Sequence, residues 1–308
     1  MLRSVIDVGS NSVLLLVSEQ RNGIWIPIFE DTSVTALGEG TKQTGLLSDH
    51  AMTRTLAAIR QFVTKAEELG CPKTLTGATM AARIATNSAD FLARAEAQRT
   101  PIIILTGEQE AQLGFESVIN DPKFLTYPRV TILDPGGQST EVVIANRTTT
   151  GSEILFKRSF PIGTLGLKST YFPEERASGI QILRASSSID EVVGTCFRPN
   201  DSGVVIALGA AGTNLVSIRN KSQEWQPELV HGARLSFEEI SRAVGTLMPL
   251  SDLERANIIG MERGREKTIH LGALLLERLL YALRAEECLV SIRGWRHALL
   301  DKGSLEPL

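Results

Sequence analysis

The chain has 308 residues, which is long enough for two domains of ordinary size, each with its own hydrophobic core. Hydrophobic residues make up 43% of it and the formal net charge is −3, so the composition excludes a global basic field that would recruit nucleic acid or a membrane surface. A polyanionic substrate would need a local basic patch instead. The cysteines Cys71, Cys196 and Cys288 are too sparse for a disulfide framework or a zinc site, which favours a reducing, cytoplasmic compartment.

No segment of the sequence has the pattern of a secretory signal or of a membrane span. The N-terminus runs directly into a predicted strand that contains Asp7. The most apolar helical stretch, residues 271–283, is interrupted by Glu277 and Arg278, which favours a core helix over a transmembrane one. We therefore expect no membrane partner.

The first part of the chain alternates strands and helices. Residues 2–33 predict three strands, with turns at 9–12 and at Asn22-Gly23, which is a strong hairpin signal. A glycine-rich loop at 37–40 precedes a long amphipathic helix that Ser48 caps. The elements that follow are a strand at 73–79, a helix start containing Arg83, a helix at 87–97, a strand at 101–105 and a helix at 108–119.

The second part of the chain repeats this alternation. The segment 120–127 has turn chemistry, so we place a domain boundary there and predict domains at residues 1–123 and 124–308. The predicted elements beyond it are strands at 129–133 and 154–160, a glycine hairpin between them, a buried strand at 203–208, a small-residue turn at 209–213 and a mostly helical remainder. The alternation in both parts predicts an α/β architecture.

An acidic residue followed by a glycine turn occurs twice between two predicted strands. The copies are Asp7-x-Gly9 followed by Ser10, Asn11 and Ser12, and Asp134-Pro-Gly136-Gly137 followed by Ser139 and Glu141. Glycine lets backbone N–H groups approach an anion closely, and an acid at the mouth of the turn can hold a bridging cation. One such hairpin is usually only a hairpin, but two copies suggest a duplicated plan. We therefore expect two actin-like (ribonuclease H-like) α/β domains of the sugar-kinase type, with the ligand in an interdomain cleft.

A series of short motifs strengthens this interpretation. They are IDVGSNS (residues 6–12), LGEG (37–40), ATxxxR (78–83), TGxxEA (106–111), LDxGGxSTE (133–141), FPxG (160–163) and GxxGT (209–213). In this order they resemble the exopolyphosphatase / guanosine pentaphosphate phosphohydrolase family in its short two-domain form. The match covers nearly the whole chain, and several motifs in the right order are far more specific than any one of them.

The resemblance implies a role for each set of motif residues. Glu110 corresponds to the catalytic glutamate that orients and deprotonates water, and Arg83 to an arginine that clamps phosphate. The implied metal ligands are Asp7, Asp134 and Glu141, with Mg²⁺ as the cofactor, Mn²⁺ as a substitute and K⁺ as a stimulant. The implied phosphate-binding residues are Gly9, Ser10, Asn11, Ser12, Gly136, Gly137 and Ser139.

Each of these residues also has an ordinary structural interpretation. Glu110 could be a solvated acid in the first turn of a helix, and Arg83 a surface arginine. Loop aspartates often cap turn amides, a strand glutamate is usually just exposed, and the glycines fit ordinary hairpin chemistry. Glu108 occupies a variable position of its motif. The turn at 209–213, which holds nucleotide in sugar-kinase-like relatives, is equally well explained as a helix N-terminus.

Several residues depart from the family pattern. Pro135 stands for the usual aliphatic residue and removes an N–H donor, and Gln138 adds a side chain where the phosphate loop is normally bare. Ala211 replaces a glycine of the third turn. Near the C-terminus, Ile292, His297 and Ala298 stand where an acid, an acid and a glycine are common. These changes put rate and substrate preference in doubt.

The activity implied by the resemblance is Mg²⁺-dependent removal of the terminal phosphate from polyphosphate or guanosine pentaphosphate, by a cytoplasmic homodimer that binds no nucleic acid. Short substrates are favoured because the extra helical domains of longer members are lacking. Two alternatives remain. One is an ATP-dependent phosphotransferase or ATPase of the same fold. The other, motivated by Pro135 and Gln138, is a catalytically weak regulator that binds the alarmone or polyphosphate.

Overall fold

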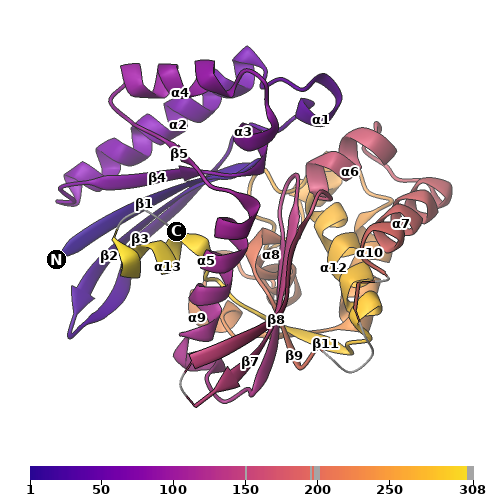
Figure 1. The fold of residues 1–308 in the computed structure, drawn as a ribbon. Helices are drawn as coiled ribbons and strands as arrows, with labels where there is room; N and C mark the ends of the chain where they lie inside the picture. The colour runs from indigo at the N-terminus through magenta and orange to yellow at the C-terminus, as the bar shows by residue number, and fades with distance from the viewer. Residues whose placement is uncertain (150, 195, 198–201, 304–308) are drawn as a thin grey trace. The chain divides into compact units, whose positions relative to one another are not determined.

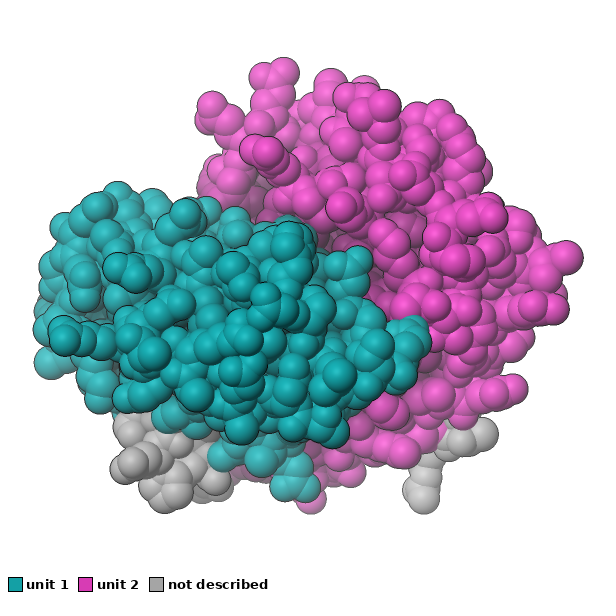
Figure 2. Space-filling model, turned by 90° about the horizontal axis from the view of Figure 1, so that it is seen from above, with its two compact units in different colours: residues 1–113, 295–308 teal, residues 114–294 magenta. Residues whose placement is uncertain are grey.

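The computed structural model describes residues 1–149, 151–194, 196–197 and 202–303, and Figure 1 shows its ribbon. The chain forms two compact units, which Figure 2 colours separately. Unit 1 contains Met1–Leu113 together with the C-terminal segment from Trp295, and unit 2 contains Gly114–Gly294. Each unit is built around a mixed β-sheet with helices, so the predicted α/β class is confirmed.

Within its described residues, unit 1 has a five-stranded sheet in the order β3-β2-β1-β4-β5. The strands are β1 (Leu2–Val8), β2 (Ser12–Arg21), β3 (Ile24–Val34), β4 (Thr74–Ala78) and β5 (Ile103–Ile104). The first three form an antiparallel meander, whereas β4 pairs parallel to β1 and β5 parallel to β4. The helices are α1 (Thr41–Thr44), α2 (Asp49–Glu68), α3 (Met80–Ile84), α4 (Ser88–Ala97), the first half of α5 (Gly107–Ile119) and α13 (Trp295–Lys302).

Different helices cover the two faces of this sheet, as Figure 1 shows. On one face lies α2, which Ser48 caps as predicted by accepting a hydrogen bond from the N–H of Ala51. Its buried face, including Ile59, joins the larger hydrophobic core of the unit. On the other face lies α13, where Trp295 packs with Val5 of β1 in a second cluster. The C-terminal helix therefore completes the core of unit 1.

In unit 2, the described residues form a six-stranded sheet in the order β10-β11-β9-β6-β7-β8. The strands are β6 (Arg129–Pro135), β7 (Thr140–Thr148), β8 (Gly151–Phe160), β9 (Val204–Ala207), β10 (Arg234–Ser236) and β11 (Glu287–Val290). As in unit 1, an antiparallel meander (β6, β7, β8) continues into parallel strands, here β9 and β11. The helical segments are η1 (Pro122–Phe124), α6 (Thr164–Tyr171), α7 (Gly179–Val193), α8 (Gly209–Asn220), α9 (Pro227–Val230), α10 (Phe237–Leu247), α11 (Asp252–Ala256) and α12 (Ile269–Leu283).

The core of unit 2 is organised around α12, the apolar stretch that the sequence predicts to be a core helix. Leu271, Leu275 and Leu279 are fully buried in it, and the helix contacts α6, α7, α8 and α10. Arg278 interrupts the apolar run where the helix meets α7, and its guanidinium forms an ion pair with Asp190. Among the described helices, none combines the length and the apolar character that a membrane crossing requires.

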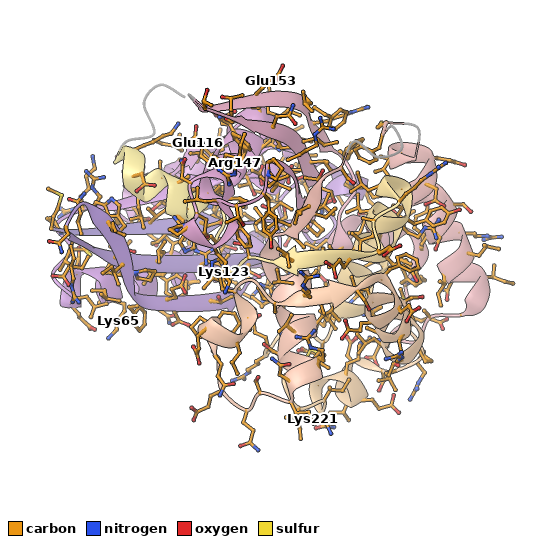
Figure 3. The ribbon with its side chains drawn as sticks, turned by 90° about the horizontal axis from the view of Figure 1, so that it is seen from below. Lys65, Glu116, Lys123, Arg147, Glu153 and Lys221 are labelled. Carbon is orange, nitrogen blue, oxygen red and sulfur yellow. The ribbon has the colours of Figure 1, made fainter. Side chains whose placement is uncertain are left out.

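The observed division of the chain differs from the expected boundary after residue 123. It falls within α5, and the turn that follows α5 belongs to unit 2. Arg147 of β7, labelled in Figure 3, gives the physical reason, since its guanidinium donates to the carbonyl oxygens of Ile119, Phe124 and Tyr127. These bonds tie the turn to the sheet of unit 2. At the other end of the chain, α13 returns to unit 1 instead of staying with the second half.

Because α13 packs closely on the sheet, we predict that adding a methyl group at Gly77 lowers the free energy of unfolding. A Cβ atom added to Gly77 of β4 would lie 2.7 Å from the Trp295 ring, whose side chain is itself buried. Because the ring has to shift or the strand has to bend, we expect Gly77→Ala to destabilise the protein by about 1–3 kcal/mol in urea denaturation. Gly245→Ala is the matched control: that glycine lies in α10 with no atom near the added methyl, so we expect a gain of roughly 0.5–1 kcal/mol there. Equal effects of the two changes would contradict the packing argument.

His270, in the first turn of α12, predicts an acid-dependent loss of stability. Burial lowers its pKa from 6.5 to about 3, with the positive charges of Arg255 and Lys168 as further causes. The unfolded chain takes up a proton near pH 6.5 and the folded protein does not, so the free energy of unfolding should fall as the pH drops from about 6.5 to 3. We expect His270→Leu to have a shallower slope than wild type over this range in urea melts at a series of pH values. Parallel curves would contradict this assignment.

Candidate active site

The residues selected from the first half of the sequence lie at or follow the carboxyl ends of strands β1, β4 and β5 in the unit 1 sheet. In the parallel pairing, Asp7 of β1 lies opposite Gly77 of β4, and Gly77 lies opposite Ile103 of β5. The carboxyl ends of these strands therefore share one edge, where ligands typically bind in open α/β sheets. The turn at residues 9–12, the start of α3 and the start of α5 all follow at this edge.

The turn at residues 9–12 is closed by its own backbone and fixed by the next motif. The N–H of Gly9 donates to the carbonyl oxygen of Ser12 at 2.8 Å, and an added Cβ on Gly9 would lie 3.0 Å from that oxygen. The N–H of Gly38 donates to the Ser10 carbonyl at 2.8 Å, so the LGEG motif is a structural partner of the turn. Within the described part of the chain, the buried Ser12 hydroxyl has no hydrogen-bond partner, which makes it a group that a ligand oxygen could satisfy.

Ser10 connects this turn to the helix that carries Arg83. Its hydroxyl oxygen accepts a hydrogen bond from the N–H of Ala81 at 3.1 Å, while Thr79 at the N-cap position of α3 makes no side-chain cap. A serine distant in sequence thus caps the helix. A hydroxyl has one proton and two lone pairs, so Ser10 can cap α3 and still donate to an anion.

Arg83 and Glu110 form a largely buried ion pair. Arg83 Nη1 donates to Glu110 Oε2 at 3.3 Å and to the carbonyl oxygen of Leu105 at 2.6 Å. The side chains are 22% and 11% exposed, respectively, so Glu110 is not a solvated acid and Arg83 is not a surface arginine. Thr106 and Gln109 fix the start of α5 through reciprocal bonds at 3.1 and 2.8 Å. Glu110 therefore projects from the first turn of a helix whose start is fixed by the two hydrogen bonds between Thr106 and Gln109.

The second acidic turn occupies the equivalent place in unit 2. Asp134 of β6 pairs with Glu141 of β7, and Glu141 pairs with Ser159 of β8, so the three side chains form a row on one face of the sheet. β9 runs parallel to β6 and leads into α8 at Gly209. An added Cβ on Gly209, which has a φ of +75°, would lie 3.1 Å from Asp134 Oδ1. The turn at 209–213 is thus both a helix N-terminus and a neighbour of the Asp134 carboxylate.

The peptide groups of the turn at residues 136–139 are held in a defined direction by helix α6. The N–H groups of Thr164 and Leu165, at the start of α6, donate to the carbonyl oxygens of Gly136 and Gly137 at 3.0 and 2.7 Å. Because the described peptide bonds are trans, the N–H of the residue after each carbonyl points the opposite way, away from α6. Two successive amides facing the same side make an anion-binding concavity. Gly163 permits this contact, since its Cβ would lie 2.5 Å from the Gly137 backbone.

The departures from the family pattern are accommodated by packing. The side chain of Gln138 is only 1% exposed, so it is folded into the protein. Pro135 is buried at the end of β6, opposite Thr140. The methyl group of Ala211 fits because Gly272 faces it: a Cβ on Gly272 would lie 2.8 Å from it. His297 is buried in α13 with its Nε2 3.6 Å from Glu30.

The selected residues thus divide into two sets, one in each unit. Unit 1 holds Asp7, the turn at 9–12, Arg83 and Glu110, and unit 2 holds Asp134, the turn at 136–139 and Glu141. The part of the chain that the structure describes contains no cluster of three or more His, Cys, Asp or Glu side chains placed to hold a metal ion. Ser159, which the sequence interpretation did not single out, contacts Glu141. Its only signal was its place before the FPxG motif.

Known proteins resemble this chain over most of its length. A family model for the Ppx/GppA phosphatase family matches residues 16–306. Exopolyphosphatase 2 of Mycobacterium tuberculosis is 23% identical over 97% of this chain and 96% of that protein. A bifunctional 3-dehydroquinate synthase/phosphatase of Fusobacterium nucleatum is 24% identical over 91% of this chain, which spans only 43% of that longer protein.

Solved structures agree with this assignment. A Ppx/GppA family member from Aquifex aeolicus is 25% identical, with a TM-score of 0.79 over 98% of this chain and 97% of that chain. An exopolyphosphatase from Cytophaga hutchinsonii is 22% identical and shows the same fold, with a TM-score of 0.86 over 98% of both chains. Because the family model covers most of the sequence, the chain belongs to the Ppx/GppA phosphatase family, and the predicted class of enzyme, a phosphoanhydride hydrolase of the exopolyphosphatase type, is confirmed.

Proposed function

We propose that this protein removes the terminal phosphate from inorganic polyphosphate, that guanosine pentaphosphate is a second substrate, and that Glu110 activates the attacking water. The observation that carries the proposal is the Arg83–Glu110 pair beside the turn at residues 9–12. A phosphoanhydride needs neutralisation of its charged oxygens and a water held in line with the leaving oxygen. A largely buried carboxylate next to a guanidinium and an anion-accepting turn offers those functions together.

Arg83 can position Glu110 and contact phosphate at the same time. Both of its bonds to Leu105 and Glu110 come from Nη1, and Nη2 lies 3.2 Å from Met80 Sδ, a weak acceptor. A guanidinium has five N–H donors in a planar fork, so its other edge can meet two phosphate oxygens. The expected clamp and the observed ion pair are therefore compatible roles of one side chain.

The carboxylates of unit 2 fit a magnesium ion that is shared with substrate. Asp134 and Glu141 are cross-strand neighbours and supply hard oxygen donors, and Gly209 leaves room beside Asp134. Mg²⁺ usually binds through one or two carboxylates together with phosphate oxygens and water, so a closed protein cage is not required. Asp7 would serve in the same way in unit 1. When bound, the ion would neutralise charge on the phosphate oxygens.

The backbone turns are proposed to bind phosphate oxygens. The amides after Gly136 and Gly137 point away from α6, and the hydroxyls of Ser10, Ser12 and Ser139 are further candidate donors. Such donors are fixed by the fold, so they need no rearrangement when charge develops. The names of the exopolyphosphatase relatives support a polyphosphate substrate.

Glu110→Gln keeps the size of the side chain and removes the carboxylate that accepts the proton. We expect kcat for phosphate release from polyphosphate to fall by about 10²–10⁴-fold. Glu108→Gln is the matched control, because Glu108 is an exposed acid in the same turn of α5, and it should retain wild-type rates. Equal rates for Glu110→Gln and wild type would remove Glu110 from the mechanism.

Parallel turnover measurements test the substrate. Pure protein with Mg²⁺ should release phosphate from short and long polyphosphate and from guanosine pentaphosphate, with activity lost in EDTA and restored by Mg²⁺ or Mn²⁺. Turnover of guanosine pentaphosphate alone would make it the only substrate. A rise in melting temperature with ATP, without turnover of either phosphoanhydride, would point to the ATP-dependent alternative and contradict the proposal.

A further inference from the structure

We propose that Ser159 is a positioning residue, which orients the Glu141 carboxylate for binding of a divalent cation. This inference rests on the metal role of Glu141 in the proposed function and adds to it a residue outside the family motifs considered above. Ser159 does not itself touch the reacting atoms in this proposal. It acts through Glu141.

The first support is the register of three adjacent strands. Asp134 lies opposite Glu141, and Glu141 lies opposite Ser159, so carboxylate, carboxylate and hydroxyl follow one another across β6, β7 and β8. Directly opposed residues in antiparallel strands point to the same face, and neighbouring strands are about 4.8 Å apart. The hydroxyl therefore lies at the end of the row, on the side of Glu141 away from Asp134.

The second support is the hydrogen bond itself. Ser159 Oγ and Glu141 Oε1 are 2.6 Å apart, a distance typical of an O–H group that donates to an ionised carboxylate. Glu141 is only 4% exposed, so the bond compensates part of the hydration that the carboxylate loses. It also restricts rotation of the carboxylate plane. A ligand that is held in one orientation binds a metal ion better than one that has to be ordered on binding.

The third support is that the Ser159 backbone is anchored on both sides of the bond. Phe160, the next residue, is fully buried, and the Arg158 guanidinium stacks on its ring at 4.8 Å. The Thr140 hydroxyl, adjacent to Glu141, donates to the Ile162 carbonyl at 2.7 Å and links β7 to the segment after β8. A hydroxyl on such a support holds its partner in a defined position, which is what a supporting residue of a site requires.

The test is Mn²⁺ binding to the purified full-length protein, measured by electron paramagnetic resonance of the free ion. We expect Ser159→Ala to raise the dissociation constant by roughly tenfold. Ser159→Thr retains the hydroxyl and suits a strand, so it should restore affinity to near wild type. Ser152→Ala is the matched control, since Ser152 is an exposed serine on the same strand, opposite Arg147, and should leave affinity unchanged.

Activity provides a second measurement that a purely structural serine would not move. The Mg²⁺ concentration for half-maximal phosphate release should rise with the same order of variants, while kcat at saturating Mg²⁺ changes less. Thermal melts of each variant establish that it is folded. Wild-type Mn²⁺ affinity in folded Ser159→Ala would overturn the inference, and so would a loss in Ser159→Ala that Ser159→Thr fails to restore.

Glu141→Gln separates this inference from the proposal beneath it. Weakened Mn²⁺ binding in Glu141→Gln together with normal binding in Ser159→Ala would overturn the positioning role alone and leave Glu141 as a ligand. Normal binding in both variants would overturn the metal role of Glu141 in the proposed function. Weakened binding in both, with rescue by threonine, is the result we expect.

Discussion

Parallel pairing of β1 with β4, and of β6 with β9, decides where the candidate site residues lie. Each pairing brings the carboxyl end of an acid-bearing strand next to the start of a helix, α3 in unit 1 and α8 in unit 2. The chain uses the contact differently in each case. In unit 1 the turn contributes a serine that caps α3, whereas in unit 2 the helix begins with a glycine that leaves space for a carboxylate. The same topology therefore produces two sets of side chains with different chemistry.

Close approach of backbone segments is the second constraint, and it explains why small residues cluster in the motifs. Gly163 allows α6 to bind the carbonyls of Gly136 and Gly137, and this contact turns the following amides outward. Ala211 replaces the glycine that the family pattern has in the turn at 209–213. Its methyl group fits because the facing residue of α12 is Gly272, which has no side chain. A side chain at either glycine would push apart two elements that define the turn geometry. Gly163 and Gly272 thus serve close packing beside two of the candidate turns.

Local signals in the sequence were sufficient for most of the elements and for the choice of candidate site residues, but not for the short strand β10, which lies in a part predicted to be mostly helical. The strands, the two acidic turns and the Ser48 cap follow from alternation and turn chemistry that act over a few residues. The contact of Ser10 with Ala81 joins residues far apart in the chain, and that of Glu141 with Ser159 depends on strand register, so neither has a local signal. The division of the chain was missed for a related reason. It depends on Arg147 binding the turn after α5, and on α13 packing against the first sheet.

In the proposed mechanism, the carboxylate that activates water and the pair of carboxylates, Asp134 and Glu141, that binds the metal ion are different residues, carried by different units. Hydrolysis of a phosphoanhydride needs a carboxylate that accepts a proton from water and cations that neutralise the phosphate. A carboxylate that coordinates a divalent metal ion gives its lone pairs to that ion and is a poor base, so the metal ligand and the general base are best supplied by separate acids. In this chain Glu110 pairs with Arg83 in unit 1, while Asp134 and Glu141 are neighbours in unit 2. The proposed base and this carboxylate pair are therefore supported by different sheets.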